Sequence, residues 1–196
     1  MALATGEDMF GFEHRDLHEG NICLRRAGPA GRIPISTTDP CRAAFSGLEI
    51  TLLDYTLSRA RTEEGKTLFL DLDDPENEAL FEECEPGTKE QERKQRRVYS
   101  AMREHVVAQE ARESGQKQQR GGGKGESKDG ESRWAKHHPY TNVLWLAYVL
   151  EYSITHFEGP KPALKLFEDE IADVRARLRK GKEEGGWGSV AEVREE

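Results

Sequence analysis

Two side chains near the start of the printed sequence have the types and spacing to do acid–base and metal chemistry together. Asp16 carries a carboxylate that can accept a proton, and Asn21, five residues later, carries an amide oxygen of the kind that Mg²⁺ prefers. The base must face the hydroxyl that it deprotonates while the amide oxygen faces the metal, so a tight, non-helical loop has to separate them. The alternative is structural, because Asp and Asn in loops often hydrogen-bond the local backbone.

A second acidic residue, Asp54, follows a segment that predicts a strand. Residues 48–53 alternate and then run apolar, a pattern typical of a half-buried strand, and residues 22–26 predict a short strand directly after Asn21. If the two strands pair antiparallel, the start of one lies beside the end of the other. Asn21 and Asp54 would then share one end of a hairpin, close enough to bind one Mg²⁺ ion. A turn-forming role for Asp54 would need no such partner.

The eight residues from His14 to Asn21 match the catalytic loop of eukaryotic protein kinases, H-R-D-x-x-x-x-N, at its defined positions. In that loop the Asp accepts the proton of the substrate hydroxyl and the Asn holds Mg²⁺. The resemblance therefore implies that Asp16 is the catalytic base, supported by His14 and Arg15. It also implies that Asn21 and Asp54 bind magnesium and, through it, ATP.

Other segments resemble one kinase family, the haspins. Asp54-Tyr55-Thr56 stands where most protein kinases have Asp-Phe-Gly, and Leu17-His18 follows the His-Arg-Asp triplet. Arg133-Trp134 and the run from His138 to Leu146 are also similar to haspins, as are the long insert between the two motifs and the lack of an Ala-Pro-Glu triplet. The resemblance is good over two stretches and loose over a third: residues 10–59, 133–157 and, loosely, 60–106.

The haspin resemblance implies a serine/threonine protein kinase that uses ATP and phosphorylates a threonine in the tail of histone three, on chromatin in the mitotic nucleus. The cytoplasm is the alternative location. Because the histone tail is basic, acidic side chains would receive it, and His18 would line the same groove. The acidic candidates are Asp71, Asp73 and Asp74. A solvated acidic loop explains these three residues equally well.

Net charge and cysteine content indicate which other ligands and partners are not expected to bind. The net charge of −8 disfavours general binding of nucleic-acid phosphates and suits a basic peptide or protein. The three cysteines are widely spaced, so neither a disulfide framework nor a zinc site is expected, and His137-His138 lacks the usual zinc partners. No membrane association is expected, since the most apolar stretch, Val143 to Leu150, is too short to span a bilayer.

Composition predicts four regions and a mainly α (α+β) fold: the C-terminal lobe of a protein-kinase-like fold with a small β-hairpin at the catalytic loop. Residues 1–106 would hold the catalytic loop, the hairpin and the activation segment. Residues 107–132, rich in Gly, Gln, Lys and Ser, predict a disordered insertion. Residues 133–184 would form the helical remainder of the lobe, and residues 185–196 a loose tail.

Two helices are expected to form the core of this lobe. The stretch from Val143 to Ile154 is apolar on nearly every face, which is typical of a central buried helix, and Thr141 or Asn142 would cap it. A second helix should begin near Pro162 with a single apolar stripe facing the core. That stripe comprises Leu164, Phe167, Ile171, Val174 and Leu178.

A complete kinase also needs a Gly-rich loop over the phosphates and a strand lysine paired with a helix glutamate. Neither motif is present before His14, so we expect a C-lobe without its N-terminal lobe and with weak ATP affinity. One alternative is a non-catalytic, pseudokinase-like module that holds a basic tail or a regulatory partner, although such a module needs no base at Asp16. Another is a small-molecule phosphotransferase of the aminoglycoside-kinase type, disfavoured because those enzymes typically have Gly at the position of Arg15.

Overall fold

The computed structural model describes residues 2–26, 48–119, 132–180 and 185–194. Six α-helices in these ranges make the fold helix-rich: α1 (Ala2–Phe10), α2 (Glu90–Gln119), α3 (Tyr140–Thr155), α4 (Lys161–Glu170), α5 (Ala172–Arg179) and α6 (Val190–Arg194). The strands form two small antiparallel pairs, β1 (Ile22–Arg26) with β2 (Leu48–Leu52) and β3 (Ala60–Arg61) with β4 (Thr67–Leu68). Three short 3-10 helices complete the list: Glu19–Asn21, Pro75–Leu80 and Arg133–Ala135. The predicted class, mainly helical with small hairpins, is confirmed.

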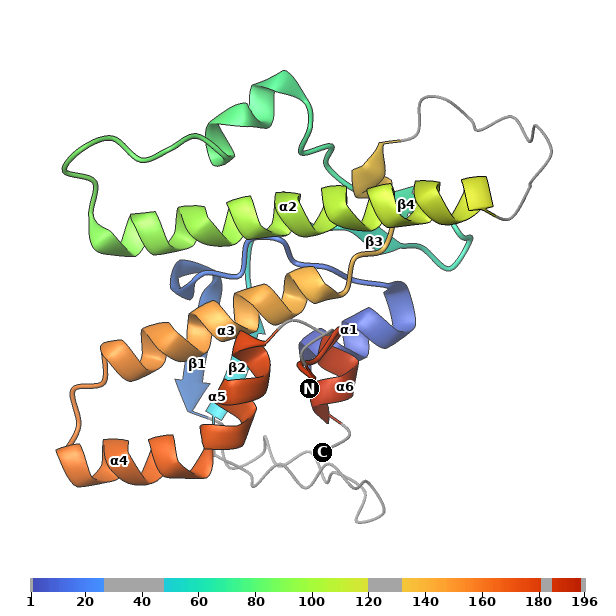
Figure 1. The fold of residues 1–196 in the computed structure, drawn as a ribbon. Helices are drawn as coiled ribbons and strands as arrows, with labels where there is room; N and C mark the ends of the chain where they lie inside the picture. The colour runs from blue at the N-terminus through green and yellow to red at the C-terminus, as the bar shows by residue number, and fades with distance from the viewer. Residues whose placement is uncertain (1, 27–47, 120–131, 181–184, 195–196) are drawn as a thin grey trace, which may run out of the picture.

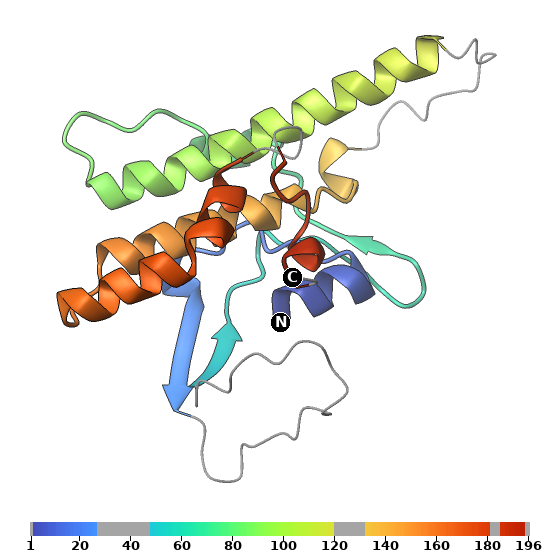
Figure 2. The same ribbon diagram turned by 60° about the horizontal axis from the view of Figure 1, so that its bottom comes forward.

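Helices α2 and α3 lie side by side, and the segment that carries the catalytic loop passes beneath them (Figures 1 and 2). Between the two helices, Trp145 donates a hydrogen bond from Nε1 to Met102 Sδ at 3.0 Å, and both side chains are completely buried. Trp134, in the segment before α3, is also completely buried. The two tryptophans are therefore core residues. No helix in the described ranges combines the length and the apolar character needed to cross a bilayer.

Helix α3 is the central helix that the sequence predicts, but its expected cap is wrong. Pro139 occupies the N-cap position, and Thr141 and Asn142 lie within the first turn. Both side chains are fully buried and point away from the helix end, toward residues just before the catalytic loop. A proline can begin the helix because an N–H group at this end would have no partner within the helix. The side chains of Thr141 and Asn142 do not cap the helix and instead bond Glu13 and His14, beside Asp16.

The predicted β1–β2 hairpin is confirmed, with Ile22 opposite Leu52 and Arg26 opposite Leu48. It projects from the helical body (Figure 2), and its outer side chains are solvated: Leu24 is 62% exposed and Ile50 is 60% exposed. The loop predicted between the two strands lies outside the described residues.

Two regional expectations need correction. The helical part of the chain extends well into the supposed disordered insertion, because α2 continues to Gln119. Its last turns are rich in Ala, Glu, Gln, Lys and Arg, which extend an established helix at little cost. The remainder of the insertion, residues 120–131, lies outside the described residues. The tail after Gly185 is not loose either, since Trp187 and Val190 are buried and α6 packs against α1.

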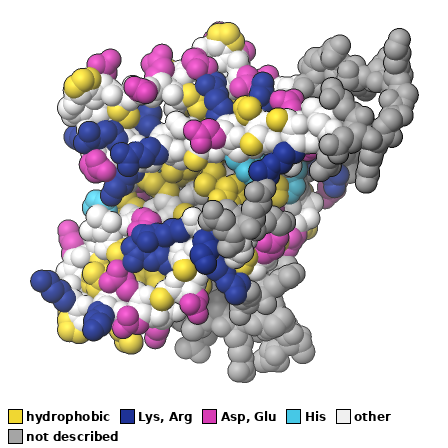
Figure 3. Space-filling view, viewed as in Figure 1, with side chains coloured by type: hydrophobic (Ala, Val, Ile, Leu, Met, Phe, Trp, Pro, Cys, Tyr) yellow, Lys and Arg dark blue, Asp and Glu magenta, His cyan; other side chains and the backbone are white. Residues whose placement is uncertain are grey.

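The second predicted helix exists but is broken. Helix α4 ends at Glu170 and α5 begins at Ala172, so the five stripe residues do not share one face. Of that stripe only Leu178 is fully buried, while Phe167 and Val174 are exposed. Hydrophobic side chains accordingly show at the surface in the region of α4 (Figure 3).

Candidate active site

The loop from Arg15 to Asn21 folds tightly around the predicted base. Arg15 has a positive φ of 63°, which turns the chain sharply before Asp16. The side-chain amide of Asn21 then donates from Nδ2 to the backbone oxygen of Asp16 at 2.8 Å and to Asp16 Oδ2 at 3.3 Å. Because the Asn21 NH₂ group faces Asp16, its amide oxygen faces a different direction. This is the separation of base and metal ligand that the spacing predicts.

Asp54 lies at the same end of the hairpin as Asn21, as predicted. The backbone N–H of Leu53 donates to Asn21 O at 2.8 Å, which continues the ladder that pairs Ile22 with Leu52. Asp54 itself has a positive φ of 54° and an exposed side chain. Its Oδ1 accepts hydrogen bonds from Thr56 N at 3.1 Å and Thr56 Oγ1 at 2.6 Å, and these bonds hold the pKa of Asp54 below its usual value.

These two side chains fit a magnesium ion. An amide oxygen and an ionised carboxylate are hard oxygen ligands, and Mg²⁺ usually takes only one or two protein carboxylates, with water and nucleotide phosphates completing the shell. Among the described residues no cluster of three or more His, Cys, Asp or Glu side chains is placed to hold a metal. A metal at the hairpin end would therefore depend on Asn21, Asp54 and non-protein oxygens.

The carboxylate of Asp16 is held at both oxygens. Asn21 contacts Oδ2, and the hydroxyl of Tyr99, from α2, donates to Oδ1. Burial raises the pKa of Asp16, and the hydrogen bond from Tyr99 opposes that rise. His18 lies beside the same group, with Nε2 3.9 Å from Asp16 Oδ1. The structure thus places His18 beside Asp16, and its place in the substrate groove stays a prediction.

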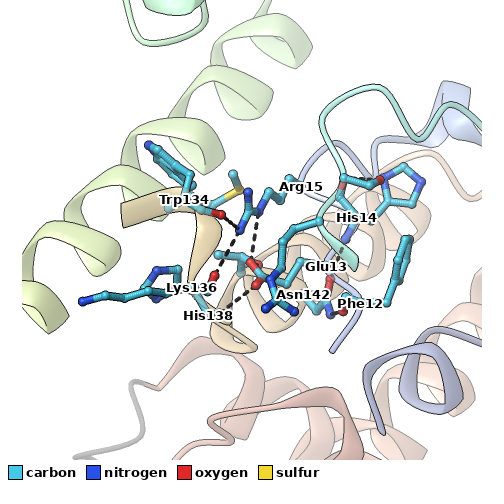
Figure 4. Close-up of polar contacts among 12 residues, drawn as sticks. Phe12, Glu13, His14, Arg15, Trp134, Lys136, His138 and Asn142 are labelled. Carbon is cyan, nitrogen blue, oxygen red and sulfur yellow. Dashed lines mark hydrogen bonds and ion pairs between the residues drawn. The ribbon is translucent and has the colours of Figure 1, made fainter. Parts of the chain in front are cut away.

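His14 connects the loop to the end of the hairpin that carries Asp54 (Figure 4). Its backbone N–H donates to Asn142 Oδ1 at 3.0 Å, and its ring Nε2 faces the carbonyl of Leu53 at 3.0 Å. Burial lowers the pKa of His14, so the ring is neutral with its proton on Nε2, which donates to Leu53. His14 therefore fixes the residue immediately before Asp54.

Arg15 joins the loop to the segment before α3, and it does so through a buried glutamate (Figure 4). Its Nε donates to Glu13 Oε2 at 3.0 Å, and one Nη donates to the carbonyl of Trp134 at 2.9 Å. Glu13 also accepts hydrogen bonds from His138 N at 2.7 Å and Thr141 Oγ1 at 3.0 Å. All of these groups are buried, so the supports of the loop form one closed network.

The three acidic candidates for substrate binding are used locally. Asp71 Oδ1 accepts from Asp73 N, and Asp74 Oδ1 accepts from Glu76 N, each at 3.0 Å. Asp73 pairs with Arg133 at 2.7 Å and with Arg103 at 3.8 Å. None of the contacts found in the described residues joins these aspartates to the catalytic loop. The structure brings together the six other candidates: His14, Arg15, Asp16, His18, Asn21 and Asp54.

Four residues that support the candidate site were not predicted to do so: Glu13, Tyr99, Glu7 and Asn142, the last of which was expected only as a helix cap. Tyr99 lies 83 residues from its partner Asp16, and Asn142 lies more than 120 residues from His14 and Glu7. No local sequence pattern therefore predicts these contacts. A pocket of about 470 Å³ also lies beside Tyr99. Its other lining residues come from the first half of α2 and the segment before it: Leu80, Lys89, Gln91, Glu92, Gln95 and Arg96.

Comparison with known proteins supports the resemblance. Residues 1–166 match the model of the haspin-like kinase domain. The chain is 32% identical over 181 residues to a serine/threonine-protein kinase haspin homolog of Arabidopsis thaliana, covering 91% of this chain and 24% of that protein. It is 28% identical over 174 residues to the serine/threonine-protein kinase haspin of Bos taurus, covering 87% and 18%. A Drosophila melanogaster haspin homolog is 29% identical over 150 residues, covering 76% and 20%.

The chain thus spans about a fifth of the length of the curated relatives it matches. The match nevertheless includes the catalytic loop, the hairpin and the helix pair that supports them. The chain belongs to the haspin-like kinase family.

Proposed function

We propose that this chain supplies the base and the magnesium ligands of a serine/threonine kinase that transfers phosphate from ATP to a hydroxyl in a basic peptide. One observation carries the proposal: Asp16, held at both oxygens, lies in the loop that leads to Asn21, and Asn21 shares the hairpin end with Asp54. A partly buried carboxylate beside two hard oxygen ligands suits phosphoryl transfer to an alcohol.

Each side chain has a distinct task in this proposal. Asp16 orients the attacking hydroxyl and accepts its proton, and the raised pKa of its buried carboxyl makes it a stronger base than a solvated aspartate. Asn21 and Asp54 hold the metal, which when bound neutralises charge on the phosphate oxygens. His14 and Arg15 keep the loop in position and touch no substrate.

Two features favour a basic substrate. The chain carries a net charge of −8, and His18 and Glu19 border the base within the loop. Family resemblance favours the tail of histone three as the peptide and nuclear chromatin as the place of action. Asp71, Asp73 and Asp74 remain predicted contacts of that tail.

The second candidate is a non-catalytic module that binds a basic tail. The exposed outer face of the β1–β2 hairpin favours it, because nothing in the described residues covers the apolar side chains of Leu24 and Ile50.

The two functions differ in what Asp16 contributes. In a phosphate-transfer assay with saturating ATP, magnesium and a histone-three tail peptide, Asp16→Asn should reduce the rate by at least about a hundredfold, since a general base contributes 10²–10⁴. Asp169→Asn, at an exposed position on α4, is the matched control and should leave the rate unchanged. Peptide binding without transfer, or transfer that survives Asp16→Asn, would contradict the kinase proposal and favour the module.

A further inference from the structure

The carboxy-terminal segment of the described chain makes an unexpected connection to the active site. We infer that residues 185–194 form a positioning element for the catalytic loop, and that Glu7 transmits their docking to His14 through Asn142. The segment lies outside residues 1–166, which match the family model. The inference concerns the geometry of the loop, and its main test needs no phosphate transfer.

The segment is firmly docked. Trp187 is 5% exposed and Val190 is 3% exposed, and α6 lies against α1, so that the two ends of the chain meet (Figures 1 and 2). Gly186 allows the close approach to α5, since a Cβ there would lie 2.0 Å from the carbonyl oxygen of Lys180. Ser189 caps the start of α6, because its Oγ accepts a hydrogen bond from Glu192 N at 3.3 Å.

Glu7 is the residue that receives α6. Its side chain is buried in α1, and Oε1 accepts from Ala191 N at 3.2 Å while Oε2 accepts from Val190 N at 3.4 Å. These are amides of the first turn of α6, which have no partner within the helix. Oε2 also accepts from Asn142 Nδ2 at 2.9 Å. These three partners, and the Ser189 hydroxyl that also hydrogen-bonds Glu7, are donors, so the site requires acceptor oxygens on both sides of the carboxyl group.

Asn142 passes this constraint to the catalytic loop. Its Nδ2 donates to Glu7 and to the carbonyl of Phe12 at 2.8 Å, which leaves Oδ1 to accept the backbone N–H of His14 at 3.0 Å. With the amide turned the other way, Oδ1 would face the carboxylate and the carbonyl, and the NH₂ group would face the N–H of His14. Glu7 therefore selects the one orientation of Asn142 that holds His14, which in turn holds Leu53 beside Asp54.

The decisive variant is Glu7→Gln, which keeps the shape of the side chain and replaces one acceptor oxygen with an NH₂ donor. Whichever way the new amide turns, the NH₂ group faces a donor from Asn142 or α6. Hydrogen exchange followed by NMR should show the His14 amide losing protection about tenfold, as expected for a weakened hydrogen bond to a charged group. The amides of Val143 to Tyr148 in α3 should change less than about twofold.

A second variant reaches the same contact from the other side. A chain that ends at Glu184 lacks α6 and should show the same local loss at His14. Glu170→Gln, at an exposed position on α4, is the control and should leave exchange unchanged. Unchanged His14 protection in both test variants would overturn the inference. So would an equal loss throughout α3, because Glu7 would then serve general stability alone.

Exchange is measured without ATP or peptide, so this result stands apart from the proposed kinase activity. Where the chain transfers phosphate, Glu7→Gln should lower kcat while leaving the KM for ATP within about twofold, because a displaced loop weakens the transition state more than ground-state binding. If neither wild type nor variant transfers phosphate, the proposed function fails and the exchange result still decides the inference.

Discussion

Asp16 occupies a partly buried position, with its side chain 16% exposed, and the pKa of its carboxyl reflects two opposing influences. Removal from water raises the pKa of its carboxyl, while the hydroxyl of Tyr99 stabilises the ionised form and lowers it. Tyr99 is itself fixed, because its ring packs edge-on against Trp145 with the ring centroids 5.3 Å apart. The orientation of the base thus depends on a side chain from the core of α2.

Tyr99→Phe should therefore impair the base without disturbing the core. The variant keeps the ring and removes only the hydroxyl, so the pKa of Asp16 should rise further, and the pH at which activity falls on the acid side should move upward. The free energy of unfolding should drop by about 1 to 2 kcal/mol for the lost hydrogen bond. A pH–rate profile and urea unfolding measure the two effects.

Tyr152→Phe is the matched control. Tyr152 lies on α3, where its ring stacks on His156 with the ring centroids 4.1 Å apart. If both tyrosine variants gave the same pH profile as wild type, Tyr99 would have no influence on the base.

The sequence identifies Asp16, Asn21 and Asp54 because each stands in a short local motif. Glu13 and Tyr99 could not be found in this way, since their roles depend on partners brought near by the fold: Glu13 accepts from His138, 125 residues away, and Tyr99 donates to Asp16. An acidic run does not by itself reveal which basic group it contacts. Asp73 stands in an acidic run that suggests a basic ligand, yet it pairs with Arg133 of the chain itself.

At the scale of elements, the catalytic loop is braced on two sides. Glu13 and Arg15 join it to the 3-10 helix Arg133–Ala135 and the start of α3. On the other side, Glu19 Oε2 accepts the hydroxyl of Tyr148, from the middle of α3, at 2.7 Å. Helix α3 thus supports the loop at two separate points, which explains why a helix buried at the centre of the domain carries polar side chains in its first turn.

Glu13→Gln should show how much the first brace contributes. The substitution leaves the Arg15 guanidinium buried without an anion, and the Gln NH₂ group would face one of three hydrogen-bond donors. The free energy of unfolding should therefore fall by about 3 to 5 kcal/mol. The control is Glu49→Gln on the hairpin, whose partner Arg25 has a side chain that is 77% exposed. That change should cost less than about 1 kcal/mol in urea unfolding. Equal effects of the two substitutions would show that burial of the Glu13–Arg15 pair is unimportant.

The elements differ in how well the sequence predicts them. The β1–β2 hairpin and α3 carry their own patterns, alternation in one and continuous apolar character in the other, and both were found. The end of α2 has the composition of a disordered segment, but a helix already anchored by Met102 and Val106 extends through it. Helix α6 depends on two buried side chains, Trp187 and Val190, too few to form a detectable pattern.

Across the whole molecule, buried histidines gather around the loop supports. His138 lies with its ring nitrogens 2.9 Å from Gln109 Oε1 and 3.0 Å from the carbonyl of Arg133, and His105 packs edge-on against it. Burial lowers the pKa of both, and of His14 and His137, below the ordinary value of 6.5. His138 is thus a packing residue of the fold, whereas the side chain of His137 is exposed.

These histidines make stability depend on pH with a definite sign. Below about pH 6.5 these histidines bind protons in the unfolded chain but remain neutral in the folded chain. The free energy of unfolding should therefore be highest above that pH and fall as the solution is acidified. Glu7 and Asp16, whose pKa values burial raises, act in the opposite direction, because in the folded state they bind protons more readily. Histidines titrate nearer to this range than carboxyl groups do, so the lowered histidine pKa values predict a net loss of stability between pH 7 and pH 5.

His105→Phe tests the assignment, because Phe can keep the ring contact with Tyr140, at 4.7 Å, and cannot take up a proton. The fall in unfolding free energy between pH 7 and pH 5 should become smaller in this variant, as measured by urea unfolding at each pH. His156→Phe, at an exposed site after α3, removes a histidine without removing a buried one and serves as the control. A pH dependence that is equally steep in wild type and in His105→Phe would show that protonation of His105 does not drive the loss.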